Sequence, residues 1–359
     1  LENGNVIVGA QGMISANAVV ESPKISISGV KVAVSIADAT LSVLQKAYIS
    51  GGSIMTTGDV NVYSWQNKLE NGLDLTALDG SDAQKLKALA IKLGLPAVAD
   101  KNAILDELRE SLWLSPTASI ADIETAYQNY FAGALASLGN NTGGINVGLI
   151  GGSANIVNAT ANATNEAYVT GTDIGSIDMR NGDLSIESNA NSYAKAGFIN
   201  NDVSVSLASL GILTMTADAK GTFNAYLDST DAVVFVKDIN IINIYIAISE
   251  AKSTQPGKGV GVELVSGKMN FATATTAANA DAYLTGSGAV NAAGISIQAT
   301  GTGSRATADI DAAKTSINGV TIAANQALAS LKLIQNAYIN GTGTVNASGP
   351  VSVLSILQD

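Results

Sequence analysis

Apolar residues occupy every second position over unusually long stretches of this chain. From Ala37 to Ile49, each alternate residue is apolar except Gln45, and the segment Ala327–Ile339 shows the same alternation. The later segment consists of good helix formers, but a helix repeats every 3.6 residues and a strand every two. The pattern therefore predicts extended strands, with an inner row of Ala, Val, Leu and Ile and an outer row of polar residues.

A tyrosine in an Ala-Tyr-aliphatic motif ends each alternating segment and lies in the outer row. The five tyrosines are Tyr48, Tyr168, Tyr226, Tyr283 and Tyr338, and from the second onward they recur at a nearly constant interval. A second motif, typified by Gly58–Val62 and Gly182–Ile186, follows shortly after each tyrosine. Two motifs with one period indicate a solenoid with a repeat of about 57 residues.

The side chains of the inner row are small, which suits coils that stack about 4.8 Å apart around a thin core, as in a parallel β-helix. A repeat of about 57 residues divides into three coils of about 19 residues, or into two coils of about 28. With three coils, the tyrosines would recur about 14 Å apart along one edge. We therefore predict an all-β solenoid over residues 1–64 and 142–359, in which each tyrosine either forms part of a binding edge or only covers a corner of the coil.

The repeat is interrupted once. The interval from Tyr48 to Tyr168 is longer than one repeat by about 63 residues, and residues 65–141 are rich in Leu, Lys, Asp and Glu. Helix-start signals at Ser81, Asp100 and Ser119 predict about three amphipathic helices there. We expect a small α-helical insertion on one face of the solenoid.

The insertion is also where we look first for specific recognition, because solenoid insertions often form the binding face. The candidate recognition residues are the aromatic side chains Trp65, Trp113, Tyr127 and Tyr130. The alternative is that the last three form the core of the helical bundle and that Trp65 fills its junction with the solenoid.

Composition excludes several classes of function. The net charge is −11, so neither nucleic acid nor an anionic membrane is expected as a partner. The chain has no Cys and no His, which excludes disulfides, thiolate ligands and a Ser/His/Asp triad within it. No stretch of about 18 apolar residues predicts a membrane span. The chain starts in strand-like rhythm without Met, so we expect it to be joined to the rest of a longer protein.

No pattern predicts catalysis, a cofactor or a metal site. The acidic pairs Asp228/Asp231 and Asp309/Asp311 lack the aromatic platforms of a glycosidase. The segment Gly301–Ala306 imitates a dinucleotide-binding loop, but strand alternation resumes where a helix should begin. We therefore expect a protein without enzymatic activity.

The segment Ala47–Gly51, followed by Gly58–Val62, resembles the repeats of large bacterial exoproteins, the leukotoxin-type adhesins related to filamentous haemagglutinin. The resemblance covers the chain except the insertion. It implies a right-handed parallel β-helix shaft that is exported by two-partner secretion and is secreted or displayed on the outer cell surface. The resemblance does not explain the helical insertion.

The expected function is a structural and adhesive shaft segment that presents binding surfaces to a protein or glycan on a host or neighbouring cell. One alternative is a leukotoxin-like cytotoxin fragment that acts on host cells. A second is a self-assembling extracellular fibre, because a solenoid with open strand edges invites end-to-end association.

Overall fold

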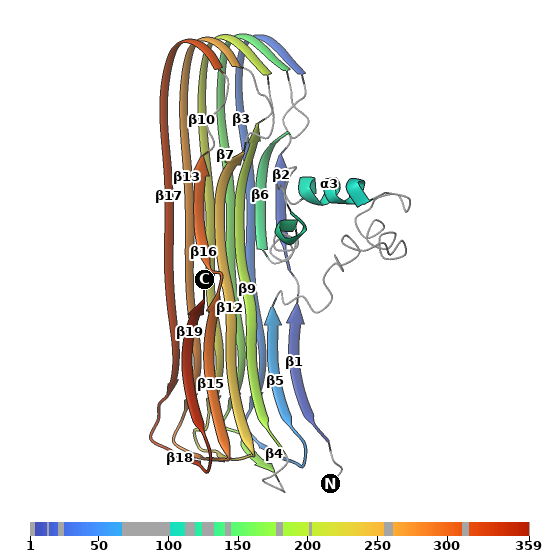
Figure 1. Cartoon of the computed structure of the whole chain (residues 1–359), viewed down its shortest axis with the longest axis vertical. Coiled ribbons are helices and arrows are strands. Elements are labelled where there is room, and N and C mark those ends of the chain that lie inside the picture. The colour runs from blue at the N-terminus through green and yellow to red at the C-terminus, as the bar shows by residue number, and fades with distance from the viewer. Residues whose placement is uncertain are drawn as a thin grey trace.

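We describe the protein from a computed structural model. The structure describes residues 4–12, 14–20, 25–66, 101–111, 119–123, 133–140, 145–176, 182–200, 203–254, 261–310 and 316–358. Its strands form three parallel sheets that run through the whole stack (Figure 1).

The long sheet contains strands of 24 to 26 residues: β3 (Ile25–Ser50), β7 (Ile145–Thr170), β10 (Val203–Asp228), β13 (Gly261–Thr285) and β17 (Ser316–Ile339). The short sheet contains β4 (Ser53–Thr56), β8 (Asp173–Ser176), β11 (Val233–Phe235), β14 (Ala289–Ala292) and β18 (Thr344–Ala347). The return sheet contains β1 (Val6–Gly12), β2 (Ala16–Val20), β5 (Val60–Gln66), β6 (Gly133–Asn140), β9 (Leu184–Asn200), β12 (Asp238–Thr254), β15 (Gly294–Thr302), β16 (Arg305–Ile310) and β19 (Val351–Gln358).

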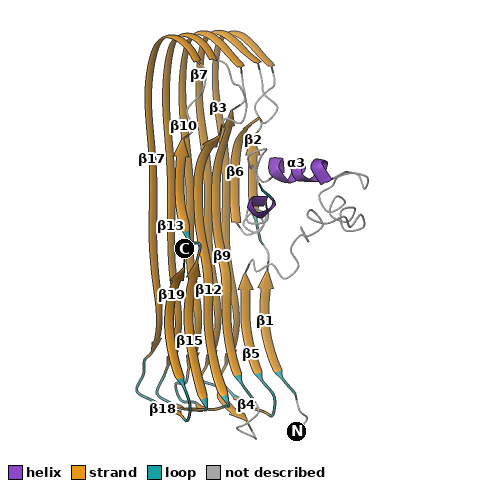
Figure 2. Ribbon diagram, viewed as in Figure 1, coloured by secondary structure: helices purple, strands orange, loops and turns teal. Residues whose placement is uncertain are grey.

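One coil passes through the three sheets in turn. In Figure 2, a return strand runs upward, and the next long strand arches over the top and runs down to the short sheet at the bottom. A long strand of 26 residues extends over roughly 85 Å. The parallel solenoid predicted from the alternation is confirmed.

The number of coils per repeat was predicted wrongly. Tyr226 pairs in register with Tyr168 on one side and with Tyr283 on the other, so each repeat forms a single coil. The expectation of two or three coils rested on strands of ordinary length, about five or six residues. Here a single long strand takes up nearly half of the repeat.

The core is a thin layer between the long and return sheets, and it consists of the predicted inner row. Ala159, Ala217 and Ala274 are buried in one cluster with Ala194 and Ala196 of the return strand β9. Methyl groups in both rows allow the two sheets to approach closely. Over the middle and last part of each long strand, the outer row is mostly polar and includes all five tyrosines, as the alternation predicted.

A polar layer crosses this apolar core. Asn165 is fully buried, and its Nδ2 donates hydrogen bonds to Ser64 O at 2.8 Å and to Ser188 Oγ at 2.9 Å. Its Oδ1 accepts a hydrogen bond from Ser64 Oγ at 2.6 Å. In the last coil Gln335, at the same level, donates to Ala299 O at 2.8 Å and to Ser355 Oγ at 3.0 Å. This layer fixes the register between the long and return sheets, because a slip would leave buried amides without partners.

The insertion interrupts one strand of the return sheet. Gln66 of β5 pairs with Ala190, and Gly133 of β6 pairs with Tyr193, so residues 67–132 stand in place of only Asn191 and Ser192. A side chain at Gly133 would collide with Tyr193 O, which accounts for glycine where the strand resumes.

The predicted boundaries of the insertion, residues 65 and 141, were therefore too wide. Trp65 lies in β5, and residues 133–140 form β6, whose Ala134, Ala136 and Leu138 are buried in the core. Leu138 lies inside the range predicted to be helical because its spacing from earlier apolar residues also fits a helix. Over so short a segment, the alternation of apolar residues does not distinguish a strand from a helix.

Two of the three predicted helices are confirmed where the structure describes them. Helix α3 (Lys101–Ser111) matches the second, and it packs with Ile104 and Leu105 buried. Residues 120–123 are helical, and Ser119 caps them because its Oγ accepts a hydrogen bond from Asp122 N at 3.2 Å. The predicted helix that begins at Ser81 lies outside the described residues.

Candidate functional site

The five tyrosines form a continuous stack across the outer face of the long sheet. Neighbouring ring centroids are 4.8 to 5.0 Å apart, and the ring planes differ by only 1° to 8°. Each inner ring therefore has both faces covered by its neighbours. A sugar needs an open aromatic face, so the inner rings of this tyrosine stack stabilise the coils and offer only ring edges and hydroxyl groups to a ligand.

The hydroxyl groups of the last three tyrosines in the stack lose their protons less readily than a free tyrosine, because their pKa values are raised. Burial, together with the neighbouring Tyr168 and Glu166, raises the pKa of Tyr226 to about 12. Burial raises the pKa of Tyr283 and Tyr338 as well.

Replacing the central tyrosine tests this stabilising role. We expect Tyr226→Ala to lower the free energy of unfolding by about 3 kcal/mol, because it removes two stacked ring contacts and a large half-buried side chain. Tyr226→Phe should cost less than about 1 kcal/mol, since the ring stays in the stack. Chemical denaturation measures both values, with Thr222→Ala on the same strand as the control. An equal cost for the Phe and Ala variants would show that the hydroxyl matters and the stack does not.

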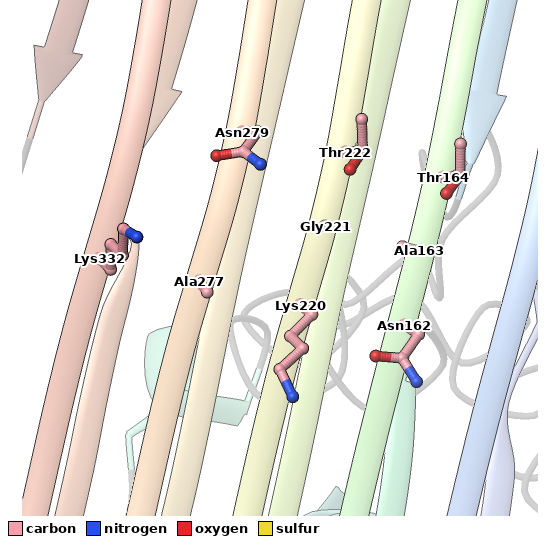
Figure 3. Close-up of a pocket in the computed structure, with 9 residues that line it drawn as sticks. All are labelled: Asn162, Ala163, Thr164, Lys220, Gly221, Thr222, Ala277, Asn279 and Lys332. Atoms are coloured by element: carbon pink, nitrogen blue, oxygen red, sulfur yellow. The ribbon is translucent and has the colours of Figure 1, made fainter.

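A shallow polar groove of about 360 Å³ crosses four long strands, a few residues before the tyrosine of each strand (Figure 3). It is lined by Asn162, Ala163, Thr164, Lys220, Gly221, Thr222, Ala277, Asn279 and Lys332. Figure 3 shows Lys220 and Lys332 on either side of the small Ala277, which leaves the depression between them. Lys220 pairs with Asp218 at 2.5 Å. The lining combines amides, hydroxyls and ammonium groups, a set that suits a polyhydroxylated or weakly acidic ligand.

An apolar surface lies on the first part of each long strand, which we call the apolar shoulder. Its residues share the outer row with the tyrosines: Val30, Val32, Val34, Ile36, Ile150, Ala154, Ile156, Ala208, Leu210, Ile212, Val265, Met269, Phe271, Val320 and Ile322. Nine of them are 46% to 80% exposed. Contiguous apolar patches of this kind on a protein surface mark interaction sites.

A cluster of charged residues lies on the outer face of the return sheet. Glu250 accepts hydrogen bonds from Tyr193 Oη at 3.1 Å and from Arg305 Nη2 at 2.7 Å. Burial alone would raise the pKa of Glu250, but Lys195, Arg305 and Tyr193 lower it. Burial lowers the pKa of Lys195, which Glu250 partly offsets. The cluster joins strands β9, β12 and β16, and every partner of the Glu250 carboxylate stabilises its charged form. We therefore interpret the cluster as a structural contact.

The charge on Glu250 predicts a pH dependence of stability. Because its pKa is lower in the folded chain than the usual 4.5, its contribution is complete above that value and is lost as the pH falls through the folded pKa. We expect Glu250→Gln to lower the free energy of unfolding by about 2 kcal/mol at pH 7, with the difference shrinking below pH 4. Asp309→Asn, in an exposed pair with Lys252, should cost less than about 0.5 kcal/mol. A difference that stayed constant from pH 7 to pH 3 would contradict this assignment.

The aromatic residues proposed for recognition are not brought together in the described part of the chain. Trp113, Tyr127 and Tyr130 lie outside the described residues. Trp65 lies on the outer face of β5 and stacks on Tyr63, with ring centroids 4.3 Å apart. It is therefore on the return sheet, whereas the tyrosine stack and the groove are on the long sheet.

The groove and the apolar shoulder were not predicted from the sequence. The groove arises from small residues beside large ones in adjacent coils, and adjacency requires the coil length. The shoulder had a signal, since Val30, Val32, Val34 and Ile36 alternate one position out of step with the buried row that begins at Ala37. That change of step marks where the apolar side of the strand turns outward.

Within the described ranges, no cluster of three or more acidic side chains is placed to hold a metal ion. No helix that the structure describes is long and apolar enough to cross a membrane. No family model, curated protein or solved structure matches the chain.

Proposed function

We propose that the chain is a structural and adhesive shaft segment of a bacterial surface exoprotein, which presents binding surfaces to a protein or glycan on another cell. The observation that carries the proposal is the polar groove, because it crosses four coils on a flat and regular sheet. Such a surface repeats its hydrogen-bonding groups about every 4.8 Å and suits a ligand that is itself extended.

The rest of the molecule supports a presenting role. The polar layer and the tyrosine stack hold adjacent coils in one register, so the outer face keeps its geometry without a ligand. The described charged cluster around Glu250 is satisfied internally and leaves no general base or nucleophile directed at an open cleft. We therefore propose a binding role without enzymatic activity.

A binding screen against glycans and host-cell surface proteins tests this function. Ala277→Tyr fills the groove, and Thr285→Tyr places the same side chain on the same strand roughly 26 Å away as a control. We expect Ala277→Tyr to reduce binding at least tenfold and Thr285→Tyr to change it less than twofold. Binding to no glycan, host protein or cell at high micromolar concentration would contradict the proposed function.

The same screen locates the contribution of the insertion. A variant in which Asn-Ser replaces residues 67–132 restores the length of β9 at this level, because only Asn191 and Ser192 occupy that place there. If binding resides on the long sheet, this variant should bind like the intact chain. Loss of binding in this variant alone would instead assign recognition to the insertion.

A self-assembling fibre subunit is the second candidate, and one observation favours it. The inner row is exposed on the last coil, where Leu331 is 49% and Ile339 is 38% exposed, whereas their counterparts in the middle coils are buried. However, a second copy whose β3 continued the long sheet beside β17 would bring its β1 into the place that β19 occupies beside β15. The two ends of the chain therefore cannot stack in register while β19 stays in place.

A further inference from the structure

The apolar shoulder reverses the usual arrangement of the coil. On the middle and last part of each long strand, the apolar row faces the core and the outer row is polar. On the shoulder, the outer row is apolar, while the inner row carries small or polar residues such as Lys31, Ser153 and Ser209. This first part of each long strand forms the arch at the top of the stack in Figure 1. The apolar side chains there point away from the core.

The size of the shoulder matches a protein interface. Five strands about 4.8 Å apart, each with four outward positions about 6.8 Å apart, cover roughly 24 by 27 Å, or about 650 Å². The largest apolar patch on a typical monomer is about 300 to 600 Å². Two copies in contact through four of the five strands would remove about 1,000 Å² from water, which lies at the low end of specific interfaces.

The charge on the shoulder also fits a second copy. None of its outward positions carries a charged side chain, although the chain as a whole has a net charge of −11. Two identical copies repel each other over most of their surfaces, and this surface is one where they can meet without placing like charges in contact. The absence of lysine and arginine removes the attraction that would hold an anionic lipid surface there.

The shape of the apolar shoulder is complementary to that of a second copy. Across the coils, one row reads Val32, Gly152, Leu210, Gly267 and Ile322, so large side chains alternate with glycines. A side chain at Gly152 would have no neighbour closer than 3.9 Å, which leaves an open notch. With a twofold axis parallel to the strands and between β10 and β13, Ile322 of each copy faces Gly152 of the other. The strands of the two sheets then run nearly aligned, which is a common way for sheets to pack face to face.

We propose that the apolar shoulder is the interface at which a second copy of this chain packs face to face to form a twofold dimer. The proposal concerns pairing of the shafts and does not depend on the adhesive role.

Analytical ultracentrifugation of the full chain from 1 to 100 µM tests the dimer. The variant Leu210→Asp with Ile322→Asp places carboxylates on two strands that lie within the contact, opposite Gly267 and Gly152 of the second copy. Both residues are at least 54% exposed, so the substitutions leave the core of the fold unchanged. Leu44→Asp is the matched control, because Leu44 is 70% exposed on the outer row of β3 but outside the shoulder.

We expect the intact chain and Leu44→Asp to be dimers at 10 µM, and the double variant to dissociate at least 100-fold more readily with an unchanged circular dichroism spectrum. A monomer at 100 µM for the intact chain would overturn the proposal, and so would a dimer unaffected by the double substitution. Sedimentation of the chain with neutral phosphatidylcholine vesicles is the second measurement. A monomeric chain that binds these vesicles, and loses binding in the double variant, would assign the shoulder to lipid and overturn the dimer.

Discussion

Deletion of residues 351–359 is expected to convert the chain from short particles into long filaments. The deletion removes β19, and the position beside β15 then becomes available to β1 of another copy. Val6 and Val351 occupy the same level of the coil, because Val6, Val60, Leu184, Ile239, Ile295 and Val351 form one in-register row. The deleted β19 and the β1 that would replace it therefore present the same type of inner side chains.

The long strands of the two ends match equally well. The inner row of β3 reads Ala37, Ala39, Leu41, Val43, Gln45, Ala47 and Ile49, and that of β17 reads Ala327, Ala329, Leu331, Leu333, Gln335, Ala337 and Ile339. With β3 beside β17, Tyr48 of one copy would extend the tyrosine stack beyond Tyr338 of the next. Burial of the exposed inner row and pairing of a whole long strand both favour association.

Negative-stain electron microscopy and pelleting at about 10 µM measure the effect. Most of the deleted chain should pellet as filaments, whereas the intact chain should stay in solution as particles no larger than dimers. A deletion variant that also carries Leu331→Asp is the control, because this carboxylate would be buried at the new junction and should prevent assembly. Deletion variants that stay as short as the intact chain would contradict the stacking geometry.

Asn165→Ala is expected to lower the free energy of unfolding by about 4 kcal/mol. The amide of Asn165 is fully buried and holds hydrogen bonds with Ser64 and Ser188, and the substitution leaves these groups without partners beside a new cavity. Denaturant titration at pH 7 measures the loss.

Asn162→Ala is the matched control for this substitution. Asn162 lies three residues earlier on the same strand, but it is on the outer row in the groove. The same chemical change there should cost less than about 0.5 kcal/mol. Similar costs at the two positions would show that the polar layer does not hold the sheets in register.

The alternation of residues was sufficient to predict the strands and their inner and outer rows, because a strand places successive side chains on opposite faces. It could not reveal the number of coils per repeat. The spacing of the tyrosines measures the length of a repeat, and nothing in that spacing tells where a strand ends. Only the pairing of Tyr168 with Tyr226 shows that one repeat returns the chain to the adjacent position.

Only part of the polar layer could be predicted from the sequence. Gln45 and Gln335 stand out as exceptions in apolar rows, but their partners on the return strand follow about 20 residues later. Their meeting depends on the length of the intervening turns and short strand. The apolar shoulder was missed for a different reason, since an alternating segment alone does not tell which of its two rows faces the core.

The single coil per repeat also sets how the molecule uses its chain. Each coil of about 57 residues lengthens the stack by only about 4.8 Å, whereas three coils per repeat would have lengthened it by about 14 Å. A stack about 100 Å long would thus require about 20 coils and roughly 1,000 residues or more. The molecule is accordingly broad and short. Each added repeat enlarges its lateral surface far more than its length along the stack.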